Sequence, residues 1–160
     1  LMHWDEDCKF FVEKSPPNML KTRFLQSVFP NCYFILITRN PIAVSYATQK
    51  WSKTSISSLL QHWIVCHDLI YRDMKYLKNV QVVSYEGLVG KPESALRSVL
   101  DFIGFEGQIN EESLTLPQKN INEKYIKLWK DDCLKFSCLQ KIKYNLLDKK
   151  VRKYGYTVKV

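Results

Sequence analysis

The chain has 160 residues, of which 46% are hydrophobic, 25% charged and 13% aromatic, and its formal net charge is +8. This composition is typical of a globular protein with one hydrophobic core, and it excludes an intrinsically disordered chain. No apolar run approaches the ~20 residues that a membrane-spanning helix needs, and the acidic first residues do not resemble a signal peptide.

The positive charge is concentrated in the last quarter of the chain. Residues 1–117 contain 12 Lys or Arg and 12 Asp or Glu, whereas residues 118–160 contain 12 basic and 4 acidic residues. A basic tail favours an anionic partner, such as a nucleotide, an acidic polysaccharide, nucleic acid or a membrane surface. The alternative is a solvated helix face, which is the commoner role of a Lys-rich helix.

Cysteine and histidine spacing gives no sign of a metal site. The five cysteines form no C-x-x-C pair, and their odd number indicates free thiols rather than a disulfide framework. His62, Cys66 and His67 lie close together in sequence, but the two histidines are five residues apart and do not share a helix face well. We therefore interpret them as residues of the core or its boundary.

A strand followed by a helix is predicted over residues 33–51. The apolar run Tyr33–Ile37 is typical of a strand buried on both faces of a parallel sheet. Asn40 suits the cap of a helix that begins at Pro41. Arg39 would then lie at the carboxyl end of a strand and beside a helix amino terminus, where open α/β sheets bind anions. A surface ion pair is an equally good interpretation of Arg39.

The preceding residues predict the first half of a βαβ unit. Phe10–Val12 is a short apolar run that favours a strand, and residues 18–28 favour a helix with one apolar face, formed by Leu20, Phe24, Leu25 and Val28. Lys14 follows the first strand as Arg39 follows the second. The two cations could therefore converge on one anion.

The rest of the chain continues the alternation of helices and strands. We predict a helix over residues 57–77 with a buried stripe, a strand at Val80–Tyr85, a turn at Glu86–Gly87, and a helix that opens near Pro92 and ends at Gly104. An irregular loop over residues 105–120, a helical tail over 121–153 and a final strand or docked segment at 156–158 would follow. The order predicts an α/β sandwich with a largely parallel sheet.

Several of these stretches together resemble a known family. They are Glu13-Lys14-Ser15-Pro16, the Arg39-x-Pro-x-Ala-Val strand-to-helix segment, and the long helix followed by a strand ending in Tyr85-Glu86. The ordered set resembles, over roughly residues 10–156, the sulfotransferase family that uses 3′-phosphoadenosine 5′-phosphosulfate (PAPS).

The resemblance implies a P-loop NTPase-like three-layer α/β sandwich with a helical C-terminal tail. It implies a single domain over residues 1–160, whose phosphosulfate-binding loop would lie upstream of this chain. It also implies transfer of a sulfuryl group from PAPS to a hydroxyl or amine acceptor, without a metal. The basic tail would suit an anionic glycan as acceptor, and no nucleic-acid partner and no membrane segment are expected.

The resemblance also assigns site residues. An Arg in the position of Arg39 binds the 3′-phosphate of the cofactor, and Lys14 and Tyr85 match positions near the nucleotide. The family's assisting Ser lies eight residues after the Arg, which is Ala47 in this sequence. Thr48 is the nearer substitute, and Ser45 would need a changed helix start. The catalytic base remains unassigned; His3 and Glu13 are candidates only if the chain is complete.

Two other functions stay open at this point. A nucleotide kinase-like enzyme of related fold would need a phosphate-binding loop of the GxxxxGK[ST] type, which this sequence lacks. A non-catalytic fragment or basic module could instead bind nucleic acid or another anion through residues 118–160. The sequence does not distinguish a cytoplasmic location from the Golgi lumen.

Overall fold

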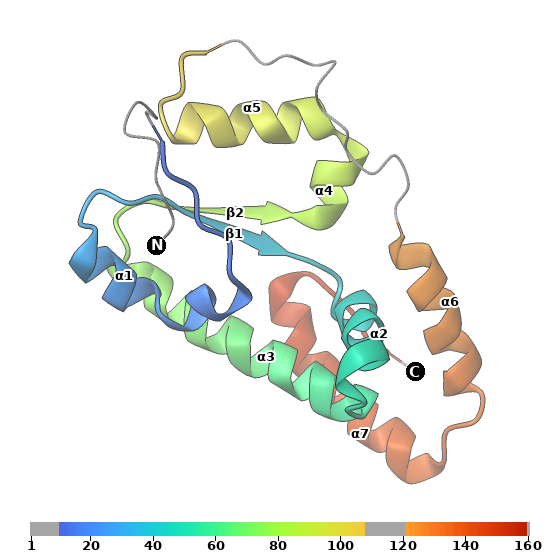
Figure 1. Ribbon diagram of the computed structural model, residues 1–160. Helices are drawn as coiled ribbons and strands as arrows, with labels where there is room; N and C mark the ends of the chain where they lie inside the picture. The colour runs from blue at the N-terminus through green and yellow to red at the C-terminus, as the bar shows by residue number, and fades with distance from the viewer. Residues whose placement is uncertain (1–9, 108–120, 160) are drawn as a thin grey trace.

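Two parallel strands form the sheet in the computed structural model, which describes residues 10–107 and 121–159 (Figure 1). Strand β1 (Phe34–Thr38) pairs with β2 (Val80–Ser84), in a register that runs from Phe34 opposite Val80 to Thr38 opposite Ser84. The connection consists of α2 (Pro41–Ser52), α3 (Ile56–Asp73) and the 3₁₀ turn η2 (Met74–Tyr76). The predicted parallel pairing is confirmed, and both strands end at the same edge of the sheet.

Helices make up most of the described chain. Those before β1 are η1 (Pro16–Leu20) and α1 (Thr22–Val28), and those after β2 are α4 (Tyr85–Gly90), α5 (Pro92–Phe102), α6 (Asn122–Cys133), α7 (Cys138–Val151) and η4 (Arg152–Tyr154). Figure 1 shows α4 and α5 on one side of the strands and α1 and α3 on the other. The class is therefore mixed α/β with a small parallel sheet, and a P-loop-like sandwich remains a prediction.

The turn between β1 and α2 forms as its sequence predicts. The Asn40 side chain accepts hydrogen bonds from the backbone N–H groups of Ile42 at 2.9 Å and Ala43 at 3.3 Å, and Pro41 occupies the first helical position. Such a cap satisfies helix-end donors that have no intrahelical acceptor. The cap fixes the place of Arg39, which immediately precedes it.

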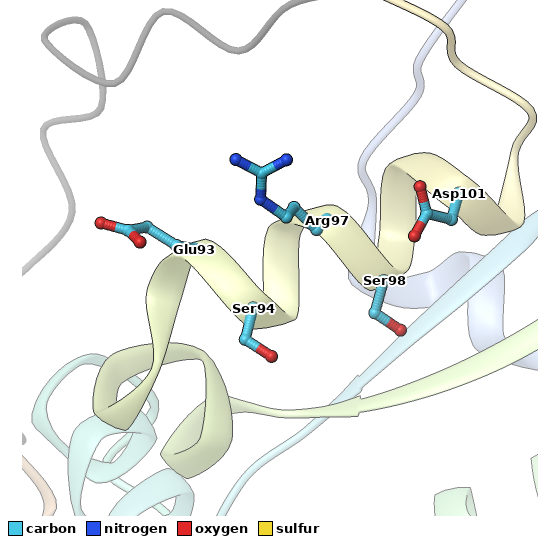
Figure 2. A pocket seen from close by; sticks show the side chains of 5 residues that line it. All are labelled: Glu93, Ser94, Arg97, Ser98 and Asp101. Atoms are coloured by element: carbon cyan, nitrogen blue, oxygen red, sulfur yellow. The ribbon is translucent and has the colours of Figure 1, made fainter.

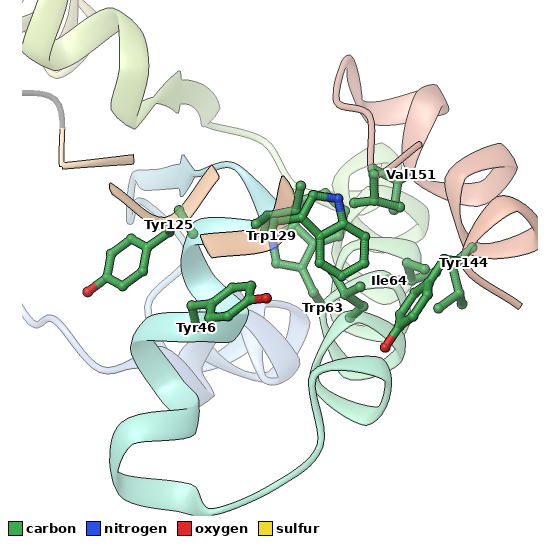
Figure 3. Packing of buried hydrophobic residues seen from close by; sticks show 12 residues of the cluster. Tyr46, Trp63, Ile64, Tyr125, Trp129, Tyr144 and Val151 are labelled. Atoms are coloured by element: carbon green, nitrogen blue, oxygen red, sulfur yellow. The ribbon is translucent and has the colours of Figure 1, made fainter. Parts of the chain in front are cut away.

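The hydrophobic core joins both halves of the chain. Its buried residues come mainly from α2, α3, α6 and α7 (Figure 3). The Trp129 ring of α6 meets Tyr144 of α7 edge-on, with 4.8 Å between ring centroids, and Tyr46 of α2 stacks on Tyr125 of α6 at 6.5 Å. The helical tail therefore packs into the same core as the strand-connecting helices.

The core also contains the predicted stripe of α3. Leu60, Trp63, His67 and Ile70 are buried, and His67 stacks on Trp63 with 3.5 Å between ring centroids. The interpretation of His67 as a core residue is confirmed. Among residues 10–107 and 121–159, no group of three His, Cys, Asp or Glu side chains could hold a metal ion. Within the same ranges no helix has the length and apolar character needed to cross a membrane.

Two predictions for the first 40 residues are wrong. Phe10–Val12 does not form a strand, because β1 pairs only with β2 in the described sheet and an extended segment needs a partner strand. The helix predicted over residues 18–28 forms as η1 and α1, and most of its apolar face is exposed, with Phe24 at 64% exposure. The β1 strand is not buried on both faces either, because Ile35 and Ile37 are exposed.

Later boundaries differ as well. Glu86–Gly87 is not a simple turn but lies in α4, whose amino end is capped by the Ser84 side chain. The long helix ends at Asp73, four residues early, and continues as η2. The predicted helical tail is confirmed and consists of α6, α7 and η4. No final strand forms at 156–158, although Val158 is buried as a docked segment would be. Most of the predicted loop, residues 108–120, lies outside the described chain, as does His3.

Candidate functional site

The carboxyl edge of the two strands brings together side chains from five parts of the chain. Arg39 follows β1, Tyr85 and Glu86 follow β2, Asn122 begins α6, and Tyr156 belongs to the C-terminal segment. Figure 1 shows the ends of both strands directed toward α2, α4 and α6. Parallel strands place their carboxyl ends together, which is where open α/β sheets bind ligands.

Arg39 is held on two sides by polar and aromatic contacts. Its Nε–H donates to Asn122 Oδ1 at 2.8 Å, and its guanidinium carbon lies 4.2 Å from the centroid of the Tyr85 ring. Among the residues that the structure describes, the buried Nη2 atom has no hydrogen-bond partner. A buried donor without an acceptor costs free energy, so an anionic acceptor at this position would be stabilising.

Glu86 connects the strand-to-helix turn to the C-terminal part of the chain. Its Oε1 accepts from the Asn40 backbone N–H at 2.9 Å and from Asn122 Nδ2 at 2.5 Å, and its Oε2 accepts from the Tyr156 hydroxyl at 3.0 Å. Both carboxylate oxygens are therefore occupied by protein donors.

Tyr156 extends this network to the end of β1. Its hydroxyl lies 3.3 Å from Thr38 Oγ1, and because the phenol proton goes to Glu86, the threonine hydroxyl is the donor in this contact. Burial, together with the adjacent Glu86 carboxylate, raises the pKa of Tyr156 to about 12, although the Thr38 hydrogen bond lowers it in part. The phenol consequently remains a proton donor throughout the physiological pH range.

The amino end of α2 offers less to an anion than its position predicts. The Asn40 backbone N–H donates to Glu86, and those of Ile42 and Ala43 donate to the Asn40 side chain. These backbone donors already have acceptors within the chain. Anion binding at this edge would therefore depend on the Arg39 side chain more than on the helix terminus.

The other predicted site residues are only partly brought to this edge. Ser45 is 1% exposed on α2, and its Oγ has no hydrogen-bond partner. Thr48 lies one turn further along the same helix and is half-buried. Lys14 is exposed in the segment before η1, and no hydrogen bond, ion pair or ring contact connects its described atoms to Arg39.

Three residues of this hydrogen-bond network were not predicted as site residues from the sequence. Glu86 carried a usable signal, because an acidic residue at the carboxyl end of the neighbouring parallel strand must lie near Arg39. Asn122 carried none, since it is 83 residues from Arg39 along the chain. Tyr156 was noted as similar to the family, but no role was assigned to it.

A shallow hollow elsewhere on the surface is not part of this site. It has a volume of about 480 Å³ and is lined by five residues of α5, Glu93, Ser94, Arg97, Ser98 and Asp101 (Figure 2). The Ser98 hydroxyl accepts a hydrogen bond from Gln81 of β2 at 2.8 Å, which ties this helix to the sheet. All of its lining residues come from one helix, and neither Arg39 nor Tyr85 is among them.

Comparison with known proteins identifies the family. The model of the sulfotransferase family matches residues 1–108, about two thirds of the chain. The chain belongs to the sulfotransferase family. The matched region of this sulfotransferase contains Arg39, Tyr85 and Glu86, whereas Asn122 and Tyr156 lie beyond it. A search of curated proteins finds no match.

Proposed function

We propose that this chain binds PAPS and takes part in the transfer of its sulfuryl group to a hydroxyl or amine acceptor. PAPS would supply the sulfuryl group, and Arg39 would bind its 3′-phosphate. The observation that supports this most directly is the half-buried Arg39, whose buried Nη2 has no hydrogen-bond partner among the described residues, at the carboxyl edge of the strands of a sulfotransferase. A guanidinium binds phosphate through charge-assisted hydrogen bonds, which its fork geometry favours.

The position of Tyr85 favours a nucleotide as the ligand over an inorganic anion. Its ring stacks with the Arg39 guanidinium, and its buried hydroxyl has no hydrogen-bond partner in the structure. A nucleotide carries a planar base, which can pack on an aromatic ring, and a phosphate, which can bind a nearby cation. We propose that Tyr85 contacts the adenine nucleotide.

A hydroxyl that assists Arg39 would come from α2. Ala47, the position where the family has Ser, packs against the hydrophobic core. We propose Thr48 for this role, because it is half-buried, whereas Ser45 is enclosed and would need a movement of its surroundings to reach a ligand. Lys14 would add charge near the cofactor only if its exposed segment moved toward the site.

The binding loop for the 5′-phosphosulfate would lie outside residues 10–107 and 121–159, since those ranges contain no glycine-rich strand-to-helix loop. We further propose that residues 1–160 form one domain. The packing of α6 and α7 against α2 and α3 in a shared core supports this.

The acceptor would be an anionic molecule, such as an acidic glycan. Residues 118–160 contain 12 basic and only 4 acidic residues, and many Lys side chains on α6 and α7 are exposed. Both observations support an anionic acceptor. We expect a sulfated glycan to shift the backbone amide resonances of α6 and α7 at low salt. A spectrum that polyanion leaves unchanged would contradict the glycan proposal.

Calorimetric titration tests the cofactor site. Adenosine 3′,5′-bisphosphate and AMP are titrated into the wild type, into Arg39→Ala and into Arg23→Ala. Arg23 is the matched control, because its guanidinium also lies over a tyrosine ring, 4.5 Å from the Tyr76 centroid, but on the exposed surface of α1.

We expect the wild type and Arg23→Ala to prefer the bisphosphate. We expect Arg39→Ala to lose that preference by roughly tenfold or more, the equivalent of one hydrogen bond between charged groups. Equal and firm binding of both ligands, unaffected by Arg39→Ala, would contradict the proposal. Preference for ATP would favour a kinase-like enzyme, and RNA binding that falls steeply with salt, without nucleotide binding, would favour a basic module.

A further inference from the structure

The Asn122 amide lies between a cation and an anion. Its Oδ1 accepts from Arg39 Nε–H at 2.8 Å, its Nδ2 donates to Glu86 Oε1 at 2.5 Å, and the residue is 2% exposed. An amide oxygen only accepts and an amide nitrogen only donates. The reversed amide would therefore place donor against donor and acceptor against acceptor. Arg39 and Glu86 together fix a single orientation of Asn122.

The anionic side of this contact is itself anchored. Glu86 also accepts from the Asn40 backbone N–H at 2.9 Å and from the Tyr156 hydroxyl at 3.0 Å. Asn40 caps α2 and directly follows Arg39 in the chain. Asn122 is thus tied to the same strand-to-helix turn from which the Arg39 side chain leaves.

This geometry determines which part of the guanidinium remains available. The Nε edge is occupied by Asn122 and one face is covered by Tyr85, while the buried Nη2 has no partner. A free arginine side chain loses considerable rotamer freedom when it binds a ligand. Holding the guanidinium in place beforehand reduces that loss at the moment of binding.

We propose that Asn122 is a positioning residue for the anion site: it fixes the Arg39 guanidinium so that the Nη2 side receives the 3′-phosphate of the nucleotide. The inference rests on the proposed function, and it assigns a role to a residue beyond the region matched by the family model, residues 1–108. Glu86 supports the arrangement by holding the amide from the other side.

A double-mutant cycle tests this role. The dissociation constants of adenosine 3′,5′-bisphosphate and AMP are measured for Asn122→Ala and Asn122→Asp, each in the wild-type and the Arg39→Ala background. Asn79→Ala is the matched control, because Asn79 is a half-buried amide that donates to the Cys32 carbonyl at 3.3 Å, outside the Arg39 network. Thermal unfolding of every variant is recorded beside the titrations.

We expect Asn122→Ala to reduce the preference for the bisphosphate by about tenfold, as loss of a hydrogen bond to a charged group would. In the Arg39→Ala background the same change should have less than a twofold effect, because residues that act through one another are not additive. Asn122→Asp should reduce the preference further, since its carboxylate would repel the phosphate. Asn79→Ala should leave the preference unchanged.

Two results would overturn the role of Asn122 while leaving the proposed function intact. One is loss of the preference in Arg39→Ala but not in either Asn122 variant. The other is an equal loss from Asn122→Ala in both backgrounds. If Arg39→Ala itself retained the preference, the proposed function would fail first. Should Asn122→Ala not fold, Asn122→Ser, whose shorter side chain does not reach Arg39 as the amide does, keeps the cycle measurable, and an unchanged preference in that variant would refute the role.

Discussion

At the scale of single residues, hydrogen-bond partners distinguish the proposed binding group, Arg39, from the carboxylate beside it, Glu86. Glu86 accepts hydrogen bonds on both carboxylate oxygens, from the Asn40 backbone, Asn122 and Tyr156, so protein donors hold this carboxylate in place. Arg39 retains an unpartnered donor, Nη2. We therefore interpret Glu86 as a structural anchor of the site and Arg39 as its binding group.

The phenol of Tyr156 should make the protein sensitive to alkaline pH. Its folded pKa of about 12 lies above the ordinary value of 10.0, mainly because of burial and the adjacent Glu86 carboxylate. The unfolded chain therefore releases this proton first, and the stabilisation from the protonated phenol is present below pH 10 and is lost as pH rises toward 12.

We expect Tyr156→Phe to reduce the free energy of unfolding at pH 7 by about 1–3 kcal/mol, because Glu86 loses a donor. The difference from the wild type should shrink between pH 10 and 12. Urea unfolding at several pH values measures it, with Tyr76→Phe, an exposed phenol, as the control. If the difference in unfolding free energy between wild type and Tyr156→Phe stayed constant up to pH 12, the phenol proton of Tyr156 would not contribute to stability.

Prediction from sequence succeeded for residues whose neighbours along the chain determine their place. Arg39 lies at a strand end beside a capped helix because Asn40 and Pro41 follow it directly. Asn122 could not be found in this way, because its contact with Arg39 depends on how α6 packs. The burial of Ser45 was not predictable either, since it depends on the same kind of packing.

At the scale of elements, one carboxylate attaches the C-terminal segment to α7. The Asp148 side chain accepts from Thr157 Oγ1 and from the Val158 backbone N–H, both at 2.7 Å, and from Arg152 Nε at 2.6 Å. Val158 is buried, and Tyr156 of the same segment reaches Glu86. The attachment therefore helps to place Tyr156 in the candidate site.

We expect Asp148→Asn to destabilise the protein by about 1.5–3 kcal/mol at pH 7, the range for a hydrogen bond to a charged group. Burial alone would raise the pKa of Asp148, but the hydrogen bonds from Thr157, Arg152 and Val158 lower it overall. Its stabilisation is thus present above the unfolded pKa, near 3.8, and is lost as pH falls through the lower folded value.

Chemical unfolding of wild type and Asp148→Asn from pH 7 to pH 2 measures this effect. The two proteins should converge in stability in acid. Asp131→Asn, which removes the same charge from an exposed position on α6, should match the wild type throughout. Equal losses in both variants would show that net charge, not the attachment, is responsible.

Element types were predictable where local signals were strong, and boundaries were not. Gly155 is such a local signal, because its backbone has a positive φ of 81° at the end of η4, a conformation that glycine adopts readily. The α4 helix was missed because it is only six residues long and depends on a single capping serine. Leu139, Ile142 and Leu146 are apolar but exposed, since α7 packs through a different face.

At the scale of the whole molecule, the aromatic core holds the candidate site together. The residues that complete the Arg39 network come from α6 and the C-terminal segment, and Trp129 packs α6 against α7. Because the core is shared with α2 and α3, loosening of the tail would release both Asn122 and Tyr156 from the strand edge.

We expect Trp129→Ala to reduce the free energy of unfolding by about 3–5 kcal/mol, as other large-to-small substitutions of buried aromatics do. Trp129→Phe should cost less, because it keeps a ring and removes an indole N–H that has no hydrogen-bond partner. Urea unfolding measures both, and Trp51→Ala is the control, since Trp51 is 76% exposed. If Trp129→Ala lowered the free energy of unfolding no more than Trp51→Ala does, the role of Trp129 in the core would be contradicted.

Fold class was predictable, but the extent of the sheet was not. Alternating helices and apolar runs predicted parallel strands joined by helices, which β1 and β2 confirm. The exposed apolar residues Phe24 and Ile37 could not be anticipated, because a sequence pattern gives the face of an element and not the element that covers it.

The most direct test of the central claim is ³¹P NMR of adenosine 3′,5′-bisphosphate bound to the wild type and to Arg39→Gln. A nearby guanidinium favours the dianionic phosphate, whose second pKa is near ~6 when free. We expect the titration midpoint of the 3′-phosphate to fall on binding to the wild type, and to return toward its free value in the variant. A 3′-phosphate that titrates identically in both proteins would show that Arg39 does not bind it.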